Sequence, residues 1–259
     1  MTFAYDVPPS IQVEVDGTIR IVRLNRPDDL NATNRELHKG LAELFPQLDA
    51  DLEARVVVLT GNGRAFSAGG DFGYIDELTK DAALRRETLV HGRQIVEGMV
   101  ACRLPVVAAV NGAAVGLGCS LVALSDIVFM AESAHLADPH VLLGLVAADG
   151  GPVTWPLLTS LQLAKEYALT GDRISAERAA QIGLANHVCP DDEVFDQALA
   201  CAKKIAKLPQ KASEDTKRIL NLHLERAVLA TLDFAFAAED RSFTSPELRA
   251  NLDRMMKKD

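Results

Sequence analysis

The sequence lacks the features that mark several large classes of protein. No run of 18 apolar residues occurs among its 259 residues, so no membrane-spanning helix is predicted. Residues 1–6 contain no basic stretch that leads into an apolar segment, so we expect no signal peptide and a soluble, cytoplasmic protein. The four cysteines have no C-x-x-C spacing, and we expect them to be reduced.

Positive charge is also scarce. Lys and Arg total 27 against 36 Asp and Glu, which gives a net charge of −9. Nucleic acids and anionic membranes bind basic patches, so neither is an expected partner. A few basic residues remain candidates for a local site that binds a phosphate-bearing ligand. They are Arg26, Arg64, Lys257 and Lys258.

The N-terminal part of the chain carries hairpin and helix signals. Apolar and polar residues alternate on both sides of an Asp-Gly turn, which predicts antiparallel strands over 11–15 and 18–24. Leucines at helical spacing then predict a helix over 34–49. Thr33 and Glu36 fit a capping box at its start.

Short apolar runs follow at 56–59, 106–110 and 127–130, and they are typical of buried parallel strands. A turn and a helical stretch follow each run, so the pattern predicts the α/β class. The last part of the chain reads as helical only. There, Ser245 and Pro246 fit the N-cap and the first turn of a final helix.

Two glycine-bearing turns, residues 65–71 and 112–118, are the most informative feature of the sequence. Glycine permits backbone angles that a side chain forbids and leaves room beside the main chain. Two such turns can direct two backbone N–H groups at one oxygen, which stabilises negative charge that develops there during a reaction. The second turn lacks the G-x-G-x-x-G spacing of a dinucleotide site, and no P-loop lysine follows it.

These turns match the patterns A-x-x-A-G-x-D and N-G-x-x-x-G-x-G, and the sequence resembles the crotonase superfamily, or enoyl-CoA hydratase/isomerase family. The resemblance extends to other short motifs, namely Asn25-Arg26-Pro27, Asn31-Ala32, Asp138-Pro139, Gly144, Leu169-Thr170-Gly171, Ala179 and Gly183-Leu184. It implies a crotonase-like spiral of β-β-α units over residues 1–190. Residues 191–259 would form a C-terminal helical oligomerisation region of a homotrimer or homohexamer, or alternatively a cover on the core.

The resemblance also implies which atoms bind the substrate. The N–H groups of Ala68 and Leu117 would bind the carbonyl oxygen of a coenzyme A thioester, and the second would lie at a helix start. Coenzyme A would then be part of the substrate, with no permanently bound cofactor and no metal. The residues expected to contact the acyl-CoA are Arg26, Ala65, Ala68, Gly69, Gly70, Asp71 and Gly116.

The acid and base residues depart from the hydratase pattern. Ser120 and His140 stand where the well-known hydratases carry two glutamates, and an unassisted hydroxyl is no base near neutral pH. Several branches of the family, dienoyl-CoA isomerases among them, place a catalytic aspartate at the position of Asp149. A histidine, with its ordinary pKa of about 6.5, and an aspartate facing one cavity would form a proton-transfer pair. The sequence does not determine which of the two is the acid.

Three hypotheses follow for the function. The first is an isomerase or a non-standard hydratase that acts on an acyl-CoA. The second is a β-diketone hydrolase independent of coenzyme A, because His140 and Asp149, followed by Trp155-Pro156, also resemble that branch. The third is a non-catalytic protein that binds acyl-CoA, another protein or RNA.

Other polar residues receive no catalytic role. Ser67, Asp71 and Glu239 are not expected to be catalytic, and His135 with His140 lacks a third metal ligand at suitable spacing. The walls of the acyl pocket are expected to come from loops such as 72–99, whose path the sequence does not predict. The sequence therefore does not predict which acyl group binds.

Overall fold

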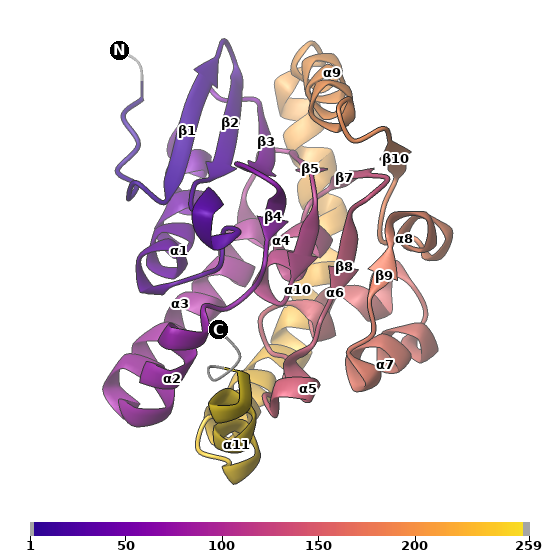
Figure 1. The fold of residues 1–259 in the computed structure, drawn as a ribbon. Helices are drawn as coiled ribbons and strands as arrows, with labels where there is room; N and C mark the ends of the chain where they lie inside the picture. The colour runs from indigo at the N-terminus through magenta and orange to yellow at the C-terminus, as the bar shows by residue number, and fades with distance from the viewer. Residues whose placement is uncertain (1–2, 256–259) are drawn as a thin grey trace.

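Two β-sheets and the helices around them make up the computed structural model, which describes residues 3–255 (Figure 1). The six-stranded sheet has the order β1-β2-β3-β5-β7-β10, and the four-stranded sheet has the order β4-β6-β8-β9. The strands are β1 Ile11–Asp16, β2 Ile19–Leu24, β3 Val56–Gly61, β4 Ala65–Ser67, β5 Val106–Val110, β6 Ala113–Val115, β7 Ile127–Ala131, β8 His135–Ala137, β9 Ile174–Ser175 and β10 His187–Cys189.

The helices fill the connections and the C-terminal part. They are η1 Pro27–Asp29, α1 Arg35–Ala50, α2 Phe72–Lys80, α3 Ala82–Ala101, α4 Leu117–Ala123, α5 His140–Leu143, α6 Gly151–Leu158, α7 Leu161–Thr170, α8 Ala176–Ile182, α9 Val194–Ala206, α10 Gln210–Ser242 and α11 Pro246–Met255. The long helix α10 passes behind the sheets in the view of Figure 1.

The chain repeatedly passes from a strand of the larger sheet to a strand of the smaller one. The pairs β3–β4, β5–β6 and β7–β8 each place one strand in either sheet. Neighbouring turns of this spiral pair in parallel, as in β3 with β5 and β5 with β7. The predicted α/β spiral is therefore confirmed, and the carboxyl ends of strands from successive turns lie together.

Most elements predicted from the sequence are present. The hairpin of β1 and β2 is antiparallel, and the three apolar runs form the buried strands β3, β5 and β7. The Oγ atom of Ser245 accepts a 3.1 Å hydrogen bond from Leu248 N and caps α11 as predicted. All four cysteines are free. None of the helices in residues 3–255 is long and apolar enough to span a bilayer.

Two local predictions were wrong. The N-cap of α1 is Asn34 rather than Thr33, because the Asn34 side chain accepts the hydrogen bond from Leu37 N. Residues 72–99 are not loops. They form α2 and most of α3, which are separated at Asp81, whose carboxylate accepts from the N–H groups of Ala83 and Leu84.

Candidate active site

A cavity of about 250 Å³ opens between the two glycine turns, α2, α3 and the C-terminal end of α10. Gly70 and Leu117 line it from the two turns, and His140, Asp149 and Glu239 contribute titratable groups. The rest of the lining is mostly apolar and includes side chains of α2 and α10. The cavity thus joins backbone donors, proton-transfer groups and an apolar compartment.

Close packing brings the two turns and His140 to one place. A Cβ atom on Gly69 would lie 3.0 Å from the carbonyl oxygen of Val115, and one on Gly116 would lie 3.6 Å from Cε1 of His140. Both glycines also have positive φ angles, 89° at Gly69 and 52° at Gly116. Other residues are strained in this conformation, so the turn geometry depends on glycine here.

The structure corrects the first predicted oxygen-binding donor. The N–H of Ala68 donates a 2.9 Å hydrogen bond to the carbonyl of Leu30 and is therefore not available to a ligand. Thr33 pairs with the segment around Gly70: its N–H donates to Gly69 O, and its carbonyl accepts from Asp71 N. The N–H of Gly70 therefore lies on the side of the chain that faces away from Thr33. Within residues 3–255 no backbone acceptor binds that N–H, and Gly70 lines the cavity.

The second predicted donor lies where the sequence places it. Leu117 is the first residue of α4, and the first N–H groups of a helix have no acceptor within the helix. The N–H of Gly116 is already bonded to Ala137 O at 2.9 Å, which fixes the turn against β8. The helix dipole favours negative charge beside the Leu117 N–H.

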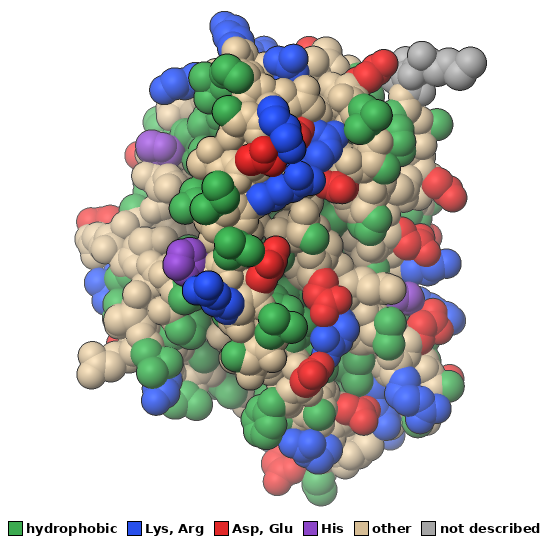
Figure 2. All heavy atoms as spheres, turned by 180° about the vertical axis from the view of Figure 1, so that it is seen from behind, with side chains coloured by type: hydrophobic (Ala, Val, Ile, Leu, Met, Phe, Trp, Pro, Cys, Tyr) green, Lys and Arg blue, Asp and Glu red, His purple; other side chains and the backbone are tan. Residues whose placement is uncertain are grey.

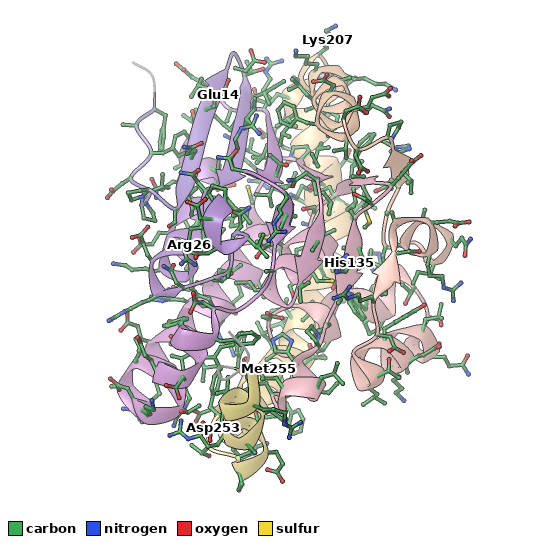
Figure 3. The ribbon with its side chains drawn as sticks, in the orientation of Figure 1. Glu14, Arg26, His135, Lys207, Asp253 and Met255 are labelled. Carbon is green, nitrogen blue, oxygen red and sulfur yellow. The ribbon has the colours of Figure 1, made fainter. Side chains whose placement is uncertain are left out.

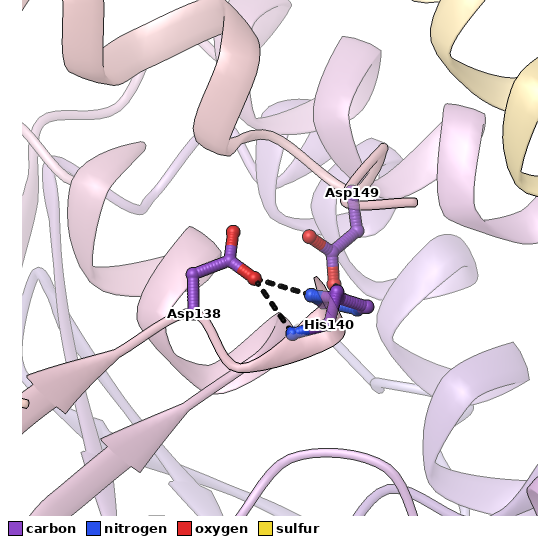
Figure 4. A group of neighbouring side chains, drawn as sticks. All are labelled: Asp138, His140 and Asp149. Carbon is purple, nitrogen blue, oxygen red and sulfur yellow. Dashed lines mark hydrogen bonds and ion pairs between the residues drawn. The ribbon is translucent and has the colours of Figure 1, made fainter. Parts of the chain in front are cut away.

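His140 lies between two carboxylates (Figure 4). Its Nδ1 is hydrogen-bonded to Oδ1 of Asp138, and its Nε2 lies 3.8 Å from Oδ2 of Asp149. Asp138 directly follows β8, His140 starts α5, and Asp149 precedes α6. The Asp138 contact orients the ring and leaves Nε2 on the side of Asp149.

This arrangement changes the titration of His140. Burial alone would lower its pKa, but the charges of Asp138 and Asp149 outweigh that effect and raise the pKa to about 10. Burial would raise the pKa of Asp138, but the His140 imidazolium holds it below its usual value. The pKa of His140 thus lies above the ordinary histidine value of 6.5, which favours the imidazolium at neutral pH.

Ser120 holds the other carboxylate. Its Oγ donates a 2.8 Å hydrogen bond to Oδ1 of Asp149, and both side chains are buried. Burial raises the pKa of Asp149, against the opposing effects of His140 and Ser120. Ser120, which replaces a hydratase glutamate, thus supports a carboxylate that arrives from another segment.

Glu239 is a site residue that the sequence reasoning missed. It lies on α10, is 8% exposed and lines the same cavity as His140 and Asp149. Burial raises its pKa to about 8, with further contributions from Asp149 and Asp138 and opposition from His140. The available signal was an acid that directly follows the apolar residues 234–238, but helical spacing does not tell which face of the helix meets the cavity.

The apolar compartment also contains neutral polar groups. Phe236 lies one helical turn before Glu239 on α10, and both line the cavity. The Tyr74 and Thr88 hydroxyls are hydrogen-bonded to each other. Burial lowers the pKa of His38 to about 3, so its imidazole is neutral. Such a compartment suits an uncharged acyl group.

Residues predicted to contact coenzyme A occupy different surroundings. Ala68, Gly69, Gly70 and Gly116 line the cavity. Ala65 is buried in β4, and its carbonyl accepts a hydrogen bond from the Asn31 amide. It is not among the residues that line the cavity.

Arg26 and Asp71, which were also predicted to contact coenzyme A, line a second hollow at the surface. The Arg26 guanidinium is 2.7 Å from an Asp29 carboxylate oxygen and 3.7 Å from an Asp71 one. Figure 3 labels Arg26, on the segment after β2. Arg64 is exposed. The candidates Lys257 and Lys258 lie outside the described residues.

Within residues 3–255, one group of side chains has ligand atoms close enough together to hold a metal ion. It consists of Asp138, His140 and Asp149, whose ligand atoms lie within 4.8 Å of one another. In this structure Nδ1 of His140 is bonded to Asp138, so that nitrogen is engaged in an ion pair rather than free to bind a metal ion. His135 lies on β8 and pairs with Ser175 of β9 (Figure 3).

The chain is similar to several known proteins. The sequence model described as enoyl-CoA hydratase/isomerase matches residues 14–256. Mitochondrial enoyl-CoA hydratase of Pongo abelii is 34% identical over 210 residues, covering 81% of this chain and 71% of that protein. The crystal structure of an enoyl-CoA hydratase/isomerase from Mycobacterium paratuberculosis has 64% identity and a TM-score of 0.95, covering 96% of this chain and 100% of that chain.

A further similar structure is a β-diketone hydrolase from the cyanobacterium Anabaena sp. PCC 7120, bound to (S)-3-oxocyclohexyl acetic acid. It has 26% identity and a TM-score of 0.85, and the match covers 91% of this chain and 94% of that one. The spiral of strand pairs and these similarities define a protein of the crotonase superfamily. The chain belongs to the enoyl-CoA hydratase/isomerase family of that superfamily.

Proposed function

We propose that this protein isomerises or hydrates an enoyl-CoA by way of a thioester enolate, with Asp149 and His140 as its proton-transfer pair. The observation that carries the proposal is one shared cavity. The free N–H groups of Gly70 and Leu117 lie in it together with His140 and Asp149. Two such donors stabilise the negative charge of an enolate oxygen.

The roles within the pair follow from the charges. His140 is an imidazolium at neutral pH and has no lone pair with which to accept a proton. Asp149 in its carboxylate form is therefore the base, and the His140 imidazolium stabilises that form from 3.8 Å. The base takes a proton from a substrate carbon in isomerisation, or from water in hydration.

Calorimetric titration tests the substrate class first. Coenzyme A, crotonyl-CoA and acetoacetyl-CoA are titrated into the purified protein. Saturable binding of the thioesters, followed by turnover in isomerase or hydratase assays, is the expected result. Failure to bind any of the three would overturn the proposal.

A β-diketone hydrolase is the second candidate, favoured by the similarity to the Anabaena β-diketone hydrolase. In that reaction the His140 and Asp149 pair would activate water for attack on a carbonyl carbon. The enolate that leaves would be stabilised by the same backbone donors. Cleavage of a cyclic β-diketone without coenzyme A, together with no thioester binding, would favour this candidate.

We also propose that the C-terminal helices assemble the chain into a homotrimer or homohexamer. Apolar side chains of α10 are strongly exposed at Ile219, Leu222 and Leu229, with 84% exposure at Leu229. The face seen in Figure 2 likewise carries apolar side chains among charged ones. Light scattering should give a trimer or hexamer, and Leu229→Glu should shift it towards the monomer. A monomeric wild-type protein would contradict the proposal.

A further inference from the structure

Glu239 reaches the cavity from a part of the chain remote from the other titratable groups. It belongs to α10, whereas His140 and Asp149 come from the segments after β8 and before α6. All three line one cavity, and Glu239 is 8% exposed. The spiral core thus supplies one carboxylate, and the C-terminal helices supply another.

Hydrogen bonds fix the end of α10 beside the segment that carries Asp149. The N–H of Val146 donates a 3.2 Å hydrogen bond to Oγ of Ser242. That hydroxyl donates in turn to the backbone carbonyl of Glu239 at 2.7 Å. The helical turn of Glu239 is therefore tied to a residue three positions before Asp149, which holds the two acids in a constant relation.

Burial keeps Glu239 in its acid form, and the surrounding charges do not offset this effect. The titratable and charged groups that face its region from the packed elements are His140, Asp138, Asp149, Tyr74, His38, Arg85 and its neighbour Asp240. Arg85 pairs with Asp240 at 2.7 Å, and Asp138 and Asp149 already flank the His140 imidazolium. Among residues 3–255, these contacts leave no unpaired cation beside a third buried carboxylate, so a charged Glu239 is disfavoured.

We propose that Glu239 is the proton donor of this site and gives its carboxyl proton to a carbon of the thioester enolate. This inference rests on the proposed function, because it requires an enolate in the cavity. In isomerisation Asp149 accepts a proton from a substrate C–H bond, and the electrons of that bond pass into the enolate. In hydration Asp149 accepts a proton from water, the water oxygen forms a C–O bond to the β-carbon, and the electrons of the C=C bond pass into the enolate. The O–H bond of Glu239 then breaks as a new C–H bond forms.

After this step Glu239 is a carboxylate and Asp149 is an acid, and one proton must pass between them before the next turnover. Solvent that enters as the product leaves supplies that exchange. No oxidant, reductant or further reactant is needed. The pKa of Glu239 is raised by burial to about 8, so the group holds its proton at neutral pH.

The test uses Glu239→Gln, which keeps the shape but has no carboxyl proton, and Glu239→Asp, which keeps the acid. Glu225→Gln, at an exposed position of the same helix, is the matched control. The wild-type protein and the variants are assayed for enoyl-CoA turnover from pH 5 to 10, with thioester binding by calorimetry and thermal unfolding to establish folding.

We expect Glu239→Gln to lose kcat by about 10²- to 10⁴-fold, the usual contribution of a proton-transfer group, with thioester binding nearly unchanged. The alkaline fall of the wild-type kcat near pH 8 should be absent in this variant, and Glu239→Asp should recover part of the rate. A folded Glu239→Gln with wild-type kcat and the same alkaline fall would overturn the inference alone. Absence of wild-type turnover would overturn the proposed function instead.

Discussion

Ser120 donates a 2.8 Å hydrogen bond to Oδ1 of Asp149, although the two residues come from different turns of the spiral. The serine hydroxyl is too weak an acid to transfer protons by itself near neutral pH. It holds the Asp149 carboxylate in place, and the carboxylate faces the cavity with His140 beside it. The cavity therefore holds a carboxylate although there is no glutamate at position 120.

The hydrogen bond from Ser120 predicts a shift in the pH profile. It lowers the pKa of Asp149, which burial raises, so Ser120→Ala should raise that pKa further. Because the base must be deprotonated, the acid limb of kcat should move to higher pH when this hydrogen bond to the carboxylate is lost. Ser125→Ala removes a hydroxyl bonded to Leu121 O and serves as the control. An unchanged acid limb would contradict the prediction.

Asp149→Asn should abolish the base while it preserves the shape of the side chain. We expect kcat for the enoyl-CoA to fall by about 10²- to 10⁴-fold. Thioester affinity measured by calorimetry should stay close to that of the wild-type protein, because the oxygen-binding N–H groups remain. Asp172→Asn, at an exposed position, should behave as wild type. If Asp149→Asn turned over every accepted substrate at the wild-type rate, Asp149 would not be the base.

The Leu117 N–H can be removed separately from its side chain. Proline is tolerated at the first position of a helix, where Leu117 stands, and it has no N–H. Leu117→Pro should lose about 10²- to 10³-fold in kcat, as for loss of one oxyanion donor. Leu117→Ala keeps the N–H and should retain most of the rate, which separates the donor from the packing. Equal rates for the two variants would remove Leu117 from the oxygen site.

The raised pKa values also predict how stability depends on pH. Glu239 binds its proton more tightly in the folded chain, with a pKa of about 8 against an ordinary value of 4.5. Its stabilising contribution is therefore complete below pH 4.5 and is lost as the pH rises through 8. His140 acts in the same direction between pH 6.5 and about 10.

Glu239→Gln should remove the first of these contributions. Its free energy of unfolding, measured with urea, should fall less than that of the wild-type protein between pH 5 and 8, and the variant should be the more stable one at pH 9. The control Glu225→Gln should follow the wild-type curve. Parallel curves for Glu239→Gln and the wild type would show that Glu239 is charged in the folded protein.

Local patterns in the sequence were sufficient for the framework. Alternating and continuous apolar runs predict β1, β2, β3, β5 and β7, because their burial depends on spacing within a few residues. The glycines of both turns were also recognisable from local sequence, since positive φ angles favour glycine wherever they occur. The resemblance to the crotonase superfamily singled out His140 and Asp149.

Only the tertiary structure decided the chemistry of the site. Whether Ala68 or Gly70 offers a free N–H depends on the partner segment at Leu30 and Thr33, which local spacing does not encode. His140 is an imidazolium because buried carboxylates surround it, and Glu239 is an acid because the folded chain brings α10 to the same cavity. Charge states and free donors depend on burial and on distant partners, and these exist only once the chain has folded.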